Sequence, residues 1–305
     1  SLNIDTYDQW KDDPQFVEDV MRFLDNVMTD FINRAPDEFA HAKYSAMRER
    51  SVGLGVMGLH SFFQQKNIPF GSVMSKVWNK KIFKNIQEKV DAASVSLAEE
   101  RGSCPDAEEY GIKERFSNKT AIAPTASISI ICGGSSPGIE PIAANSFTHK
   151  TLSGSFNVRN KYLKKILQKY KKDTDEVWSS ITTNQGSVSH LNFLTAEEKD
   201  TFKTAFEIDQ RWIVELGADR TPHISQAQSI NVFVPADIHK KELHNIHFQA
   251  WKKGLKSLYY CRSKSIQRAE NVQAGSSTDV TKNVYSKEQE SNNKDNNYEE
   301  CLSCQ

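Results

Sequence analysis

Apolar side chains recur every three or four positions in three stretches of the chain, which is the spacing of an amphipathic helix. The first stretch follows Asp13 and Pro14, which are typical of a helix N-cap and of the first helical position. Its apolar positions are Val17, Val20, Leu24, Val27, Met28 and Phe31. The second, which Gly102 can terminate, has Ile82, Ile86, Val90, Ala93 and Leu97. The third begins at the capping box Thr195-x-x-Glu198 and is expected to reach Gly217 through Phe202, Phe206, Trp212, Ile213 and Leu216.

A strand–helix–strand order follows in the last third of the chain. Residues 229–234 alternate like a strand and stop at Pro235, and 255–261 form a second apolar strand. Between them, the pattern predicts a helix over about 237–253 that Gly254 closes. This order and spacing are typical of a crossover between parallel strands, so the sequence predicts an α/β fold.

The amino-acid composition of the chain changes near residue 266. From there to the end, Asn, Ser, Lys, Glu and Gln dominate and apolar residues are few, so the segment cannot bury enough surface to order itself. We therefore expect a folded part over 1–265 and a flexible tail over 266–305.

Composition narrows the functional classes. The 39 Lys and Arg residues balance the 39 Asp and Glu residues, so net charge favours neither nucleic acid nor an anionic membrane as a partner. No apolar run approaches the roughly 18 residues of a membrane span, and the first residues do not resemble a signal peptide. We expect a cytoplasmic protein. An odd number of scattered cysteines argues against a secreted disulfide framework: Cys104, Cys132, Cys261, Cys301 and Cys304.

Two motifs are better explained by structure than by ligand binding. Gly53-Leu-Gly55-Val-Met-Gly58 matches a dinucleotide fingerprint, but no apolar strand precedes it and no acidic residue follows at the required distance. It is interpreted as a packing turn. His244 and His247 share one helical face but have no further ligand nearby, so we expect them on a solvated or partner-facing surface and predict no metal site.

The segment from Pro124 to Ser129 offers small and hydroxylated residues, followed by the Gly-rich stretch 133–138. Such loops can present backbone N–H groups to a phosphate, particularly at a helix N-terminus. Local capping by Ser and Thr explains the same composition, and on local chemistry alone it is the better explanation.

Tyr259 and Tyr260 end the second predicted strand. Two adjacent aromatic residues in a strand usually comprise one core and one surface residue, so the pair alone indicates packing.

Cys301-x-x-Cys304 lies on the predicted flexible tail. A structural zinc site needs a second pair of ligands, whereas a dithiol at this spacing can close a disulfide and exchange it with another thiol pair. Tyr260 and Cys301 are 41 positions apart. A flexible chain of that length spans on the order of 35 Å, which suits a shuttle between two sites.

Taken together, the segments resemble the large subunit of class I ribonucleoside-diphosphate reductase, in the form related to bacteriophage and enterobacterial enzymes. The resemblance runs in family order from about residue 45 to the C-terminus. The matching segments are Arg50–Gly58, Arg101–Pro105, Ala123–Ser129, Gly138–Pro141, Gln228–Pro235, His247–Trp251, Leu255–Tyr260 and Glu300–Cys304.

The resemblance implies the C-terminal half of the family's ten-stranded α/β barrel, with a small helical or α/β insertion at about 30–115. It implies that the substrate, a ribonucleoside diphosphate, binds through its phosphates to Thr125, Ala126, Ser127 and Ile128.

It also implies that Tyr260 receives a radical from a separate small subunit, whose dimetal centre generates a tyrosyl radical, and that Tyr259 passes it inward. No cofactor is expected on this chain itself. Cys301 and Cys304 would re-reduce the active-site disulfide and be reduced in turn by thioredoxin or glutaredoxin.

One departure from the family pattern limits the expected activity. The family's thiyl cysteine lies in an Asn-x-Cys-x-Glu segment, which this sequence lacks. Cys104, Cys132 and Cys261 do not occupy the contexts of the catalytic cysteines and are interpreted as structural or incidental. We therefore expect a split or truncated subunit, inactive alone and completed by an N-terminal large-subunit fragment that carries the thiyl cysteine.

Two alternatives stay open. A fragment of a cobalamin-dependent reductase would share the barrel and the tail dithiol, but the adjacent tyrosines disfavour it. A non-catalytic assembly or regulatory homologue would keep the fold without the activity, and the presence of every matched functional residue disfavours that.

Overall fold

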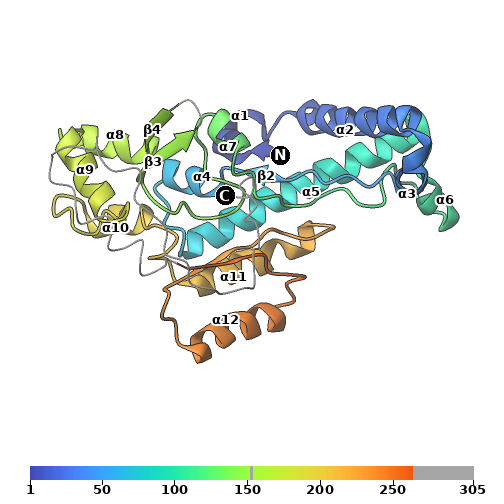
Figure 1. The fold of residues 1–305 in the computed structure, drawn as a ribbon. Helices are drawn as coiled ribbons and strands as arrows, with labels where there is room; N and C mark the ends of the chain where they lie inside the picture. Colours follow the sequence, from blue (N-terminus) through green and yellow to red (C-terminus); the bar gives the residue numbers. More distant parts are fainter. Residues whose placement is uncertain (152–153, 264–305) are drawn as a thin grey trace, which may run out of the picture.

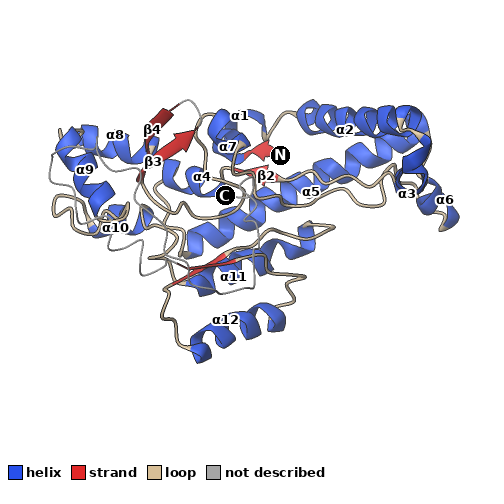
Figure 2. Ribbon diagram, viewed as in Figure 1, coloured by secondary structure: helices blue, strands red, loops and turns tan. Residues whose placement is uncertain are grey.

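The computed structural model describes residues 1–151 and 154–263, in which helices surround short strands (Figures 1 and 2). The cysteine tail and the predicted boundary at 265 therefore lie outside the described residues. The α-helices are α1 (Tyr7–Trp10), α2 (Pro14–Arg34), α3 (Ala40–Glu49), α4 (Leu59–Gln65), α5 (Val73–Arg101), α6 (Pro105–Glu109), α7 (Ile128–Ile131), α8 (Lys161–Lys169), α9 (Asp175–Thr183), α10 (Ala196–Thr201), α11 (Gln210–Arg220) and α12 (Lys240–Lys252). The strands are β1 (Leu2–Asn3), β2 (Val56–Met57), β3 (Ser146–Thr151), β4 (Gly154–Arg159), β5 (Val232–Val234) and β6 (Cys261–Ser263).

Segments far apart in sequence line up as one parallel array. β1 pairs with β2, and β5 pairs with β6, both in parallel. Two single parallel bridges join these pairs through the segment 120–122: Leu54 to Thr120, and Ile122 to Gln228. Helix α5 connects β2 to that segment, and α12 connects β5 to β6. The predicted crossover between parallel strands is confirmed. β3 and β4 form a separate antiparallel hairpin.

The main core lies between this array and the long helices. α5 places Ile82, Phe83, Ile86, Val90 and Leu97 at the expected helical spacing, and each is almost fully buried. α2 lies alongside α5 (Figure 1) and contributes Val17 and Met21. A second, smaller core around Trp178 joins α8, α9, the segment between α9 and α10, and Phe202 just after α10.

The helix ends agree with the sequence in three cases. The Asp13 side chain accepts from the Gln15 N–H, with Pro14 at the first helical position, and Gly102 ends α5 with a φ of 87°. The capping box at Thr195 and Glu198 also forms. However, the single helix predicted from there to Gly217 is wrong. α10 stops at Thr201, and α11 begins separately because the Asp209 side chain caps it by accepting from Arg211 N–H.

The second predicted strand also differs. The ladder is regular only from Cys261 to Ser263, not over 255–261. The reason lies in the partner strand: Tyr260 N–H donates to the side-chain Oδ1 of Asn231 at 2.9 Å instead of to a backbone carbonyl. A side chain thus replaces a backbone acceptor just before β6 starts.

The glycine motif is a packing turn, as interpreted. A Cβ at Gly55 would lie 2.5 Å from the Ala121 carbonyl oxygen in the neighbouring parallel segment. Gly58 has a φ of 82° and precedes α4. Small residues here allow two strands of the array to approach closely.

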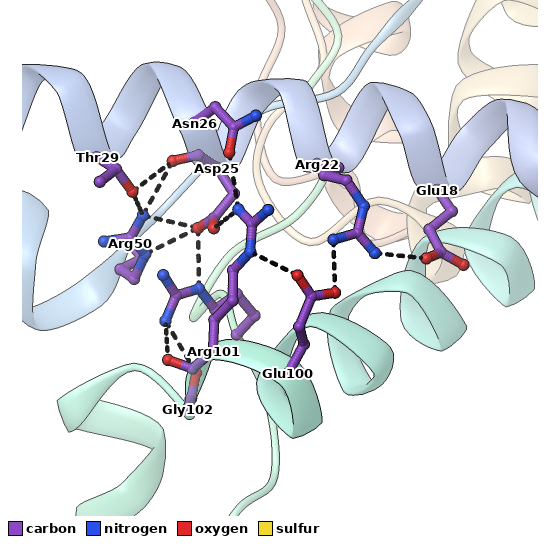
Figure 3. Close-up of polar contacts among 10 residues, drawn as sticks. Glu18, Arg22, Asp25, Asn26, Thr29, Arg50, Glu100, Arg101 and Gly102 are labelled. Atoms are coloured by element: carbon purple, nitrogen blue, oxygen red, sulfur yellow. Dashed lines mark hydrogen bonds and ion pairs between the residues drawn. The ribbon is translucent and has the colours of Figure 1, made fainter.

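A buried charge cluster joins the middle of α2 to the ends of α3 and α5 (Figure 3). Asp25, in the middle of α2, has a side chain with 0% exposure. Its Oδ1 accepts from Arg50 at 2.7 Å and from Arg115 at 2.9 Å, and its Oδ2 accepts from Arg101 at 2.8 Å. Burial alone raises the pKa of this carboxyl, but the hydrogen bonds from Arg115, Arg101 and Arg50 together lower it below its ordinary value.

Arg115 also binds the backbone, because it donates to the carbonyl of Gly102, just beyond α5. Arg50 itself has a left-handed backbone conformation (φ 44°) at the end of α3. Arg50 precedes the segment that contains β2, and Arg115 precedes the segment 120–122. Asp25 therefore holds the starts of two neighbouring strands against α2.

We predict that Asp25→Asn lowers the free energy of unfolding by about 3–5 kcal/mol, because it leaves three buried or half-buried arginines without their carboxylate. Urea unfolding measures the loss. Asp30→Asn, which removes an exposed ion pair with Arg34, is the control and should cost less than about 0.5 kcal/mol.

The lowered pKa of Asp25 determines how its contribution to stability depends on pH. The Asp25 carboxyl has a lowered pKa in the folded chain, so its contribution is present above the ordinary carboxyl pKa of about 3.9 and is lost as pH falls below it. The stability difference between the native chain and Asp25→Asn should therefore narrow below about pH 4; a constant difference down to pH 2 contradicts the account.

Candidate functional site

The segment from Thr125 to Ile128 forms a tight loop before α7. Thr125 is buried and has a φ of 56°, the left-handed region that a β-branched residue rarely adopts. Its hydroxyl accepts from the Gly138 N–H at 2.7 Å, and its carbonyl accepts from Ser129 N–H at 3.1 Å. The strain of this backbone is thus held by hydrogen bonds from both sides.

Three consecutive backbone N–H groups remain available in this loop. Within the described residues, the N–H groups of Ala126, Ser127 and Ile128 donate to no acceptor. Ser127 and Ile128 are exposed. Adjacent free N–H groups in a turn are well suited to an anion. α7 is only one turn long, so the loop backbone, and not a helix dipole, is the main feature of the site.

Residues that the sequence reasoning missed hold the far end of this loop. Ser136 N–H donates to the Ser61 hydroxyl at 2.8 Å, and Ser61 N–H donates back to the Ser136 hydroxyl at 3.1 Å. The Ser135 hydroxyl donates to buried Asp5 at 3.1 Å. Tyr162 also donates to Asp5, and its burial together with this hydrogen bond raises the pKa of Tyr162. Nothing in the local sequence pattern indicates these contacts, because the partners lie 75 to 157 positions apart.

The tyrosine pair lies at the start of β6. The ring centroids of Tyr259 and Tyr260 are 4.1 Å apart with 52° between the ring planes. Both side chains are 44% exposed, so the expectation of one core and one surface residue is wrong. Tyr259 N–H donates to the Ile230 carbonyl at 2.8 Å, which fixes the backbone of Tyr259 against the residues just before β5. Both rings are therefore accessible from one end of a parallel strand pair.

The loop and the tyrosines are connected through the segment 138–141. Gly138 N–H binds Thr125, and two residues later the Glu140 carboxyl accepts from the backbone N–H of Asn231. The Asn231 side chain in turn accepts from Tyr260 N–H. The structure thus joins two of the features that the sequence singled out into one region. In the sequence this segment stands out only as part of the resemblance, and nothing there indicates a role for Glu140.

Cys301 and Cys304 lie outside the described residues, while Cys104 is buried and Cys132 and Cys261 are exposed free thiols.

His244 and His247 are exposed on α12, as expected. Over 1–151 and 154–263, no group of three or more potential metal ligands is found. No helix in the same residues is both long enough and apolar enough to cross a membrane.

Comparison with known proteins identifies the family. The model of the ribonucleotide reductase barrel domain matches residues 1–111 and 105–261. The ribonucleoside-diphosphate reductase large subunit of Invertebrate iridescent virus 6 is 49% identical over 276 residues, which are 89% of this chain and 29% of that protein. The corresponding subunit of Invertebrate iridescent virus 3 is 44% identical over 89% of this chain and 43% of its own length.

A solved structure agrees with this. The Actinobacillus ureae class Id ribonucleotide reductase alpha subunit matches with a TM-score of 0.80 and 38% identity, over 88% of this chain and 49% of its own. The present chain therefore spans less than half the length of these relatives. The expected α/β barrel fold is confirmed, and the chain belongs to the ribonucleotide reductase large-subunit family.

Proposed function

We propose that this chain contributes a phosphate loop and a tyrosine radical relay to a ribonucleoside-diphosphate reductase. That enzyme would convert ribonucleoside diphosphates to deoxyribonucleoside diphosphates by a radical mechanism. One observation carries the proposal: a loop whose three backbone N–H groups are free within the described residues is hydrogen-bonded, through 138–141 and Asn231, to the start of β6, where two tyrosine rings lie side by side. The residues that would bind substrate and those that would receive the radical are then held at fixed positions relative to one another.

The diphosphate would bind at Thr125, Ala126, Ser127 and Ile128. The free N–H groups are the donors, and Thr125 shapes the loop because its hydroxyl binds Gly138. Backbone donors recognise phosphate in any nucleotide, so this loop sets affinity and leaves base selection to other parts of the enzyme.

Thr125→Val should raise the KM for a ribonucleoside diphosphate about tenfold in the assembled enzyme, with a smaller effect on kcat. The change keeps the shape of the side chain but leaves the Gly138 N–H without an acceptor, which costs about 1–3 kcal/mol of loop stability. Thr125→Ser retains the hydroxyl and is the matched control. An unchanged KM for the Val variant would show that the loop does not position phosphate.

The tyrosine pair would carry the radical. With centroids 4.1 Å apart, the two phenols are close enough for a short hop between them. Because both rings are 44% exposed, each can face another protein surface. We assign Tyr260 as the residue that receives the radical from the small subunit, whose dimetal centre generates it, and Tyr259 as the residue that passes it inward.

Tyr259→Phe and Tyr260→Phe should each reduce dCDP formation to background in the assembled complex. Phenylalanine keeps the aromatic ring but lacks the phenol hydroxyl, which is the group that tyrosine oxidation requires. Tyr44→Phe, at another exposed tyrosine, is the control. Size-exclusion chromatography establishes that each variant still assembles. Retained dCDP formation by either relay variant would refute the role.

The thiyl cysteine must come from a segment that contains Asn-x-Cys-x-Glu, on the same polypeptide or on another. Among the described residues, β1 and β6 each pair along one edge only, so the parallel array can be extended at both ends. The activity test therefore mixes this chain with such a large-subunit segment and a small subunit.

The expected result of that mixture is dCDP formation, with none when the segment is left out. Turnover without it would contradict the proposal, as would binding of the small subunit without any product in the full mixture. The second outcome would indicate a non-catalytic assembly protein.

Cys301 and Cys304 would serve as the redox tail, reduced by thioredoxin or glutaredoxin. We predict that Cys301→Ser or Cys304→Ser abolishes turnover with thioredoxin but preserves it with a small dithiol that reaches the active site directly. Cys261→Ser, at an exposed thiol, is the control. An equal loss of turnover with thioredoxin and with the small dithiol would contradict the role of these cysteines as the redox tail.

A further inference from the structure

His60 is a fully buried histidine to which the proposed function assigns no role. It lies in the first turn of α4, is 0% exposed, and its ring packs edge-on against Phe70 with the ring centroids 5.3 Å apart. Burial lowers the pKa of His60 to about 3, although a hydrogen bond to the Thr201 backbone acts in the opposite direction. The imidazole is therefore neutral near pH 7, and a neutral buried imidazole still needs hydrogen-bond partners.

The Nδ1 atom of His60 binds the backbone of Ile142. It accepts from the Ile142 N–H at 3.0 Å. A neutral imidazole carries one proton, so acceptance at Nδ1 places that proton on Nε2. The carbonyl of Ile142 accepts from Ala205 N–H at 2.7 Å, so the peptide groups on both sides of Ile142 are held.

The same turn of α4 holds the other end of the segment 136–142. Gly58 N–H donates to the Ser136 carbonyl at 2.7 Å. Ser61 and Ser136 each donate a backbone N–H to the hydroxyl of the other, at 3.1 Å and 2.8 Å. The start of α4 thus binds this segment at its first residue and again, through His60, at its last.

Gly138 lies between these two attachments, and its N–H donates to the Thr125 hydroxyl at 2.7 Å. Pro137 and Pro141 stand on either side of it, and Glu140 N–H closes a turn by donating to the Pro137 carbonyl at 3.1 Å. Each proline ring fixes its own φ, so the segment is stiff. A displacement at one end is therefore transmitted to Gly138 and not absorbed on the way.

We propose that His60 is a positioning residue for the phosphate loop: through the stiff segment 136–142, it sets the direction of the Gly138 N–H towards Thr125. The inference rests on the proposed function of that loop. Thr125 has a φ of 56°, and such a strained backbone persists only while its partners stay in place. Without an acceptor at Nδ1, the far end of the segment shifts to find another partner, and the hold on Thr125 weakens.

A purely structural role makes a different prediction. If His60 only filled space beside Phe70, any substitution would lower the stability of the whole fold and release all core N–H groups alike. A positioning role predicts selective release of the Gly138 N–H. The informative quantity is therefore the hydrogen-exchange rate of Gly138 relative to that of Ile86, which is 3% exposed in α5.

Two substitutions separate the two ring nitrogens. Asparagine places its side-chain oxygen near the position of Nδ1, so His60→Asn keeps the acceptor for Ile142. Glutamine reaches only the position of Nε2, so His60→Gln loses that acceptor. Both remove the ring from its contact with Phe70, which makes them a matched pair.

Amide hydrogen exchange is followed by NMR on the full chain without other subunits. In His60→Gln, the Gly138 N–H should exchange about tenfold faster relative to Ile86, and in His60→Asn the ratio should keep its reference value. An unchanged ratio in folded His60→Gln, or the same increase in both variants, would overturn the proposal.

A second measurement applies if His60→Gln fails to fold. Nitrogen-15 NMR of labelled histidine in the unchanged chain distinguishes a protonated ring nitrogen from an unprotonated one by its chemical shift. The proposal requires an unprotonated Nδ1 and a proton on Nε2 at pH 7. A proton on Nδ1 would leave Ile142 without its acceptor and would overturn the proposal.

Kinetics of the assembled enzyme separate this inference from the proposed function. His60→Gln should raise the KM for a ribonucleoside diphosphate several-fold with a smaller effect on kcat, and His60→Asn should leave the KM unchanged. Selective release of Gly138 with an unchanged KM would support the positioning role and contradict phosphate binding by the loop. Unchanged exchange would overturn the positioning role even if Thr125→Val confirms that the loop binds phosphate.

Discussion

The buried carboxylate of Asp25 is the constraint on which the positions of the other elements depend. It binds three arginines, which come from the end of α3, the end of α5 and the segment that follows α6 (Figure 3). Arg50 and Arg115 each stand just before a strand of the parallel array. One carboxylate thus fixes where two adjacent segments of the parallel array begin, and the loop at Thr125 follows the second of these segments.

A series of contacts connects these segments to the candidate site. The segment 120–122 leads directly into the loop at Thr125, and Thr125 binds Gly138. The segment 138–141, which begins at Gly138, contacts Asn231 through Glu140, and Asn231 binds Tyr260. A relay needs fixed distances, and these side-chain contacts from the loops 125–128 and 138–141 to the strand region provide them. The fold therefore brings the proposed phosphate-binding loop and the proposed relay tyrosines into one region.

The sequence predicted what local chemistry determines. Helix caps at Asp13 and Thr195, the βαβ crossover and the packing role of Gly55 follow from spacing, side-chain acceptors and backbone sterics. It failed at the break before α11, where Asp209 caps a new helix inside an apolar run, and before β6, where the Asn231 side chain, 29 positions from Tyr260, binds the backbone. For the site, the loop and tyrosines were found through family resemblance, whereas Asp5 and Glu140 emerged only when the fold brought them to their partners.

The central claim is that Tyr260 carries an unpaired electron during turnover. The most direct measurement places an easily oxidised analogue, 3-aminotyrosine, at position 260 and records electron paramagnetic resonance spectra of the assembled complex with substrate. The account predicts a new aminotyrosyl signal that grows as the radical of the small subunit decays, and no such signal when that radical is quenched beforehand. An undiminished small-subunit radical with no signal at position 260, in a complex shown to be assembled, would contradict it.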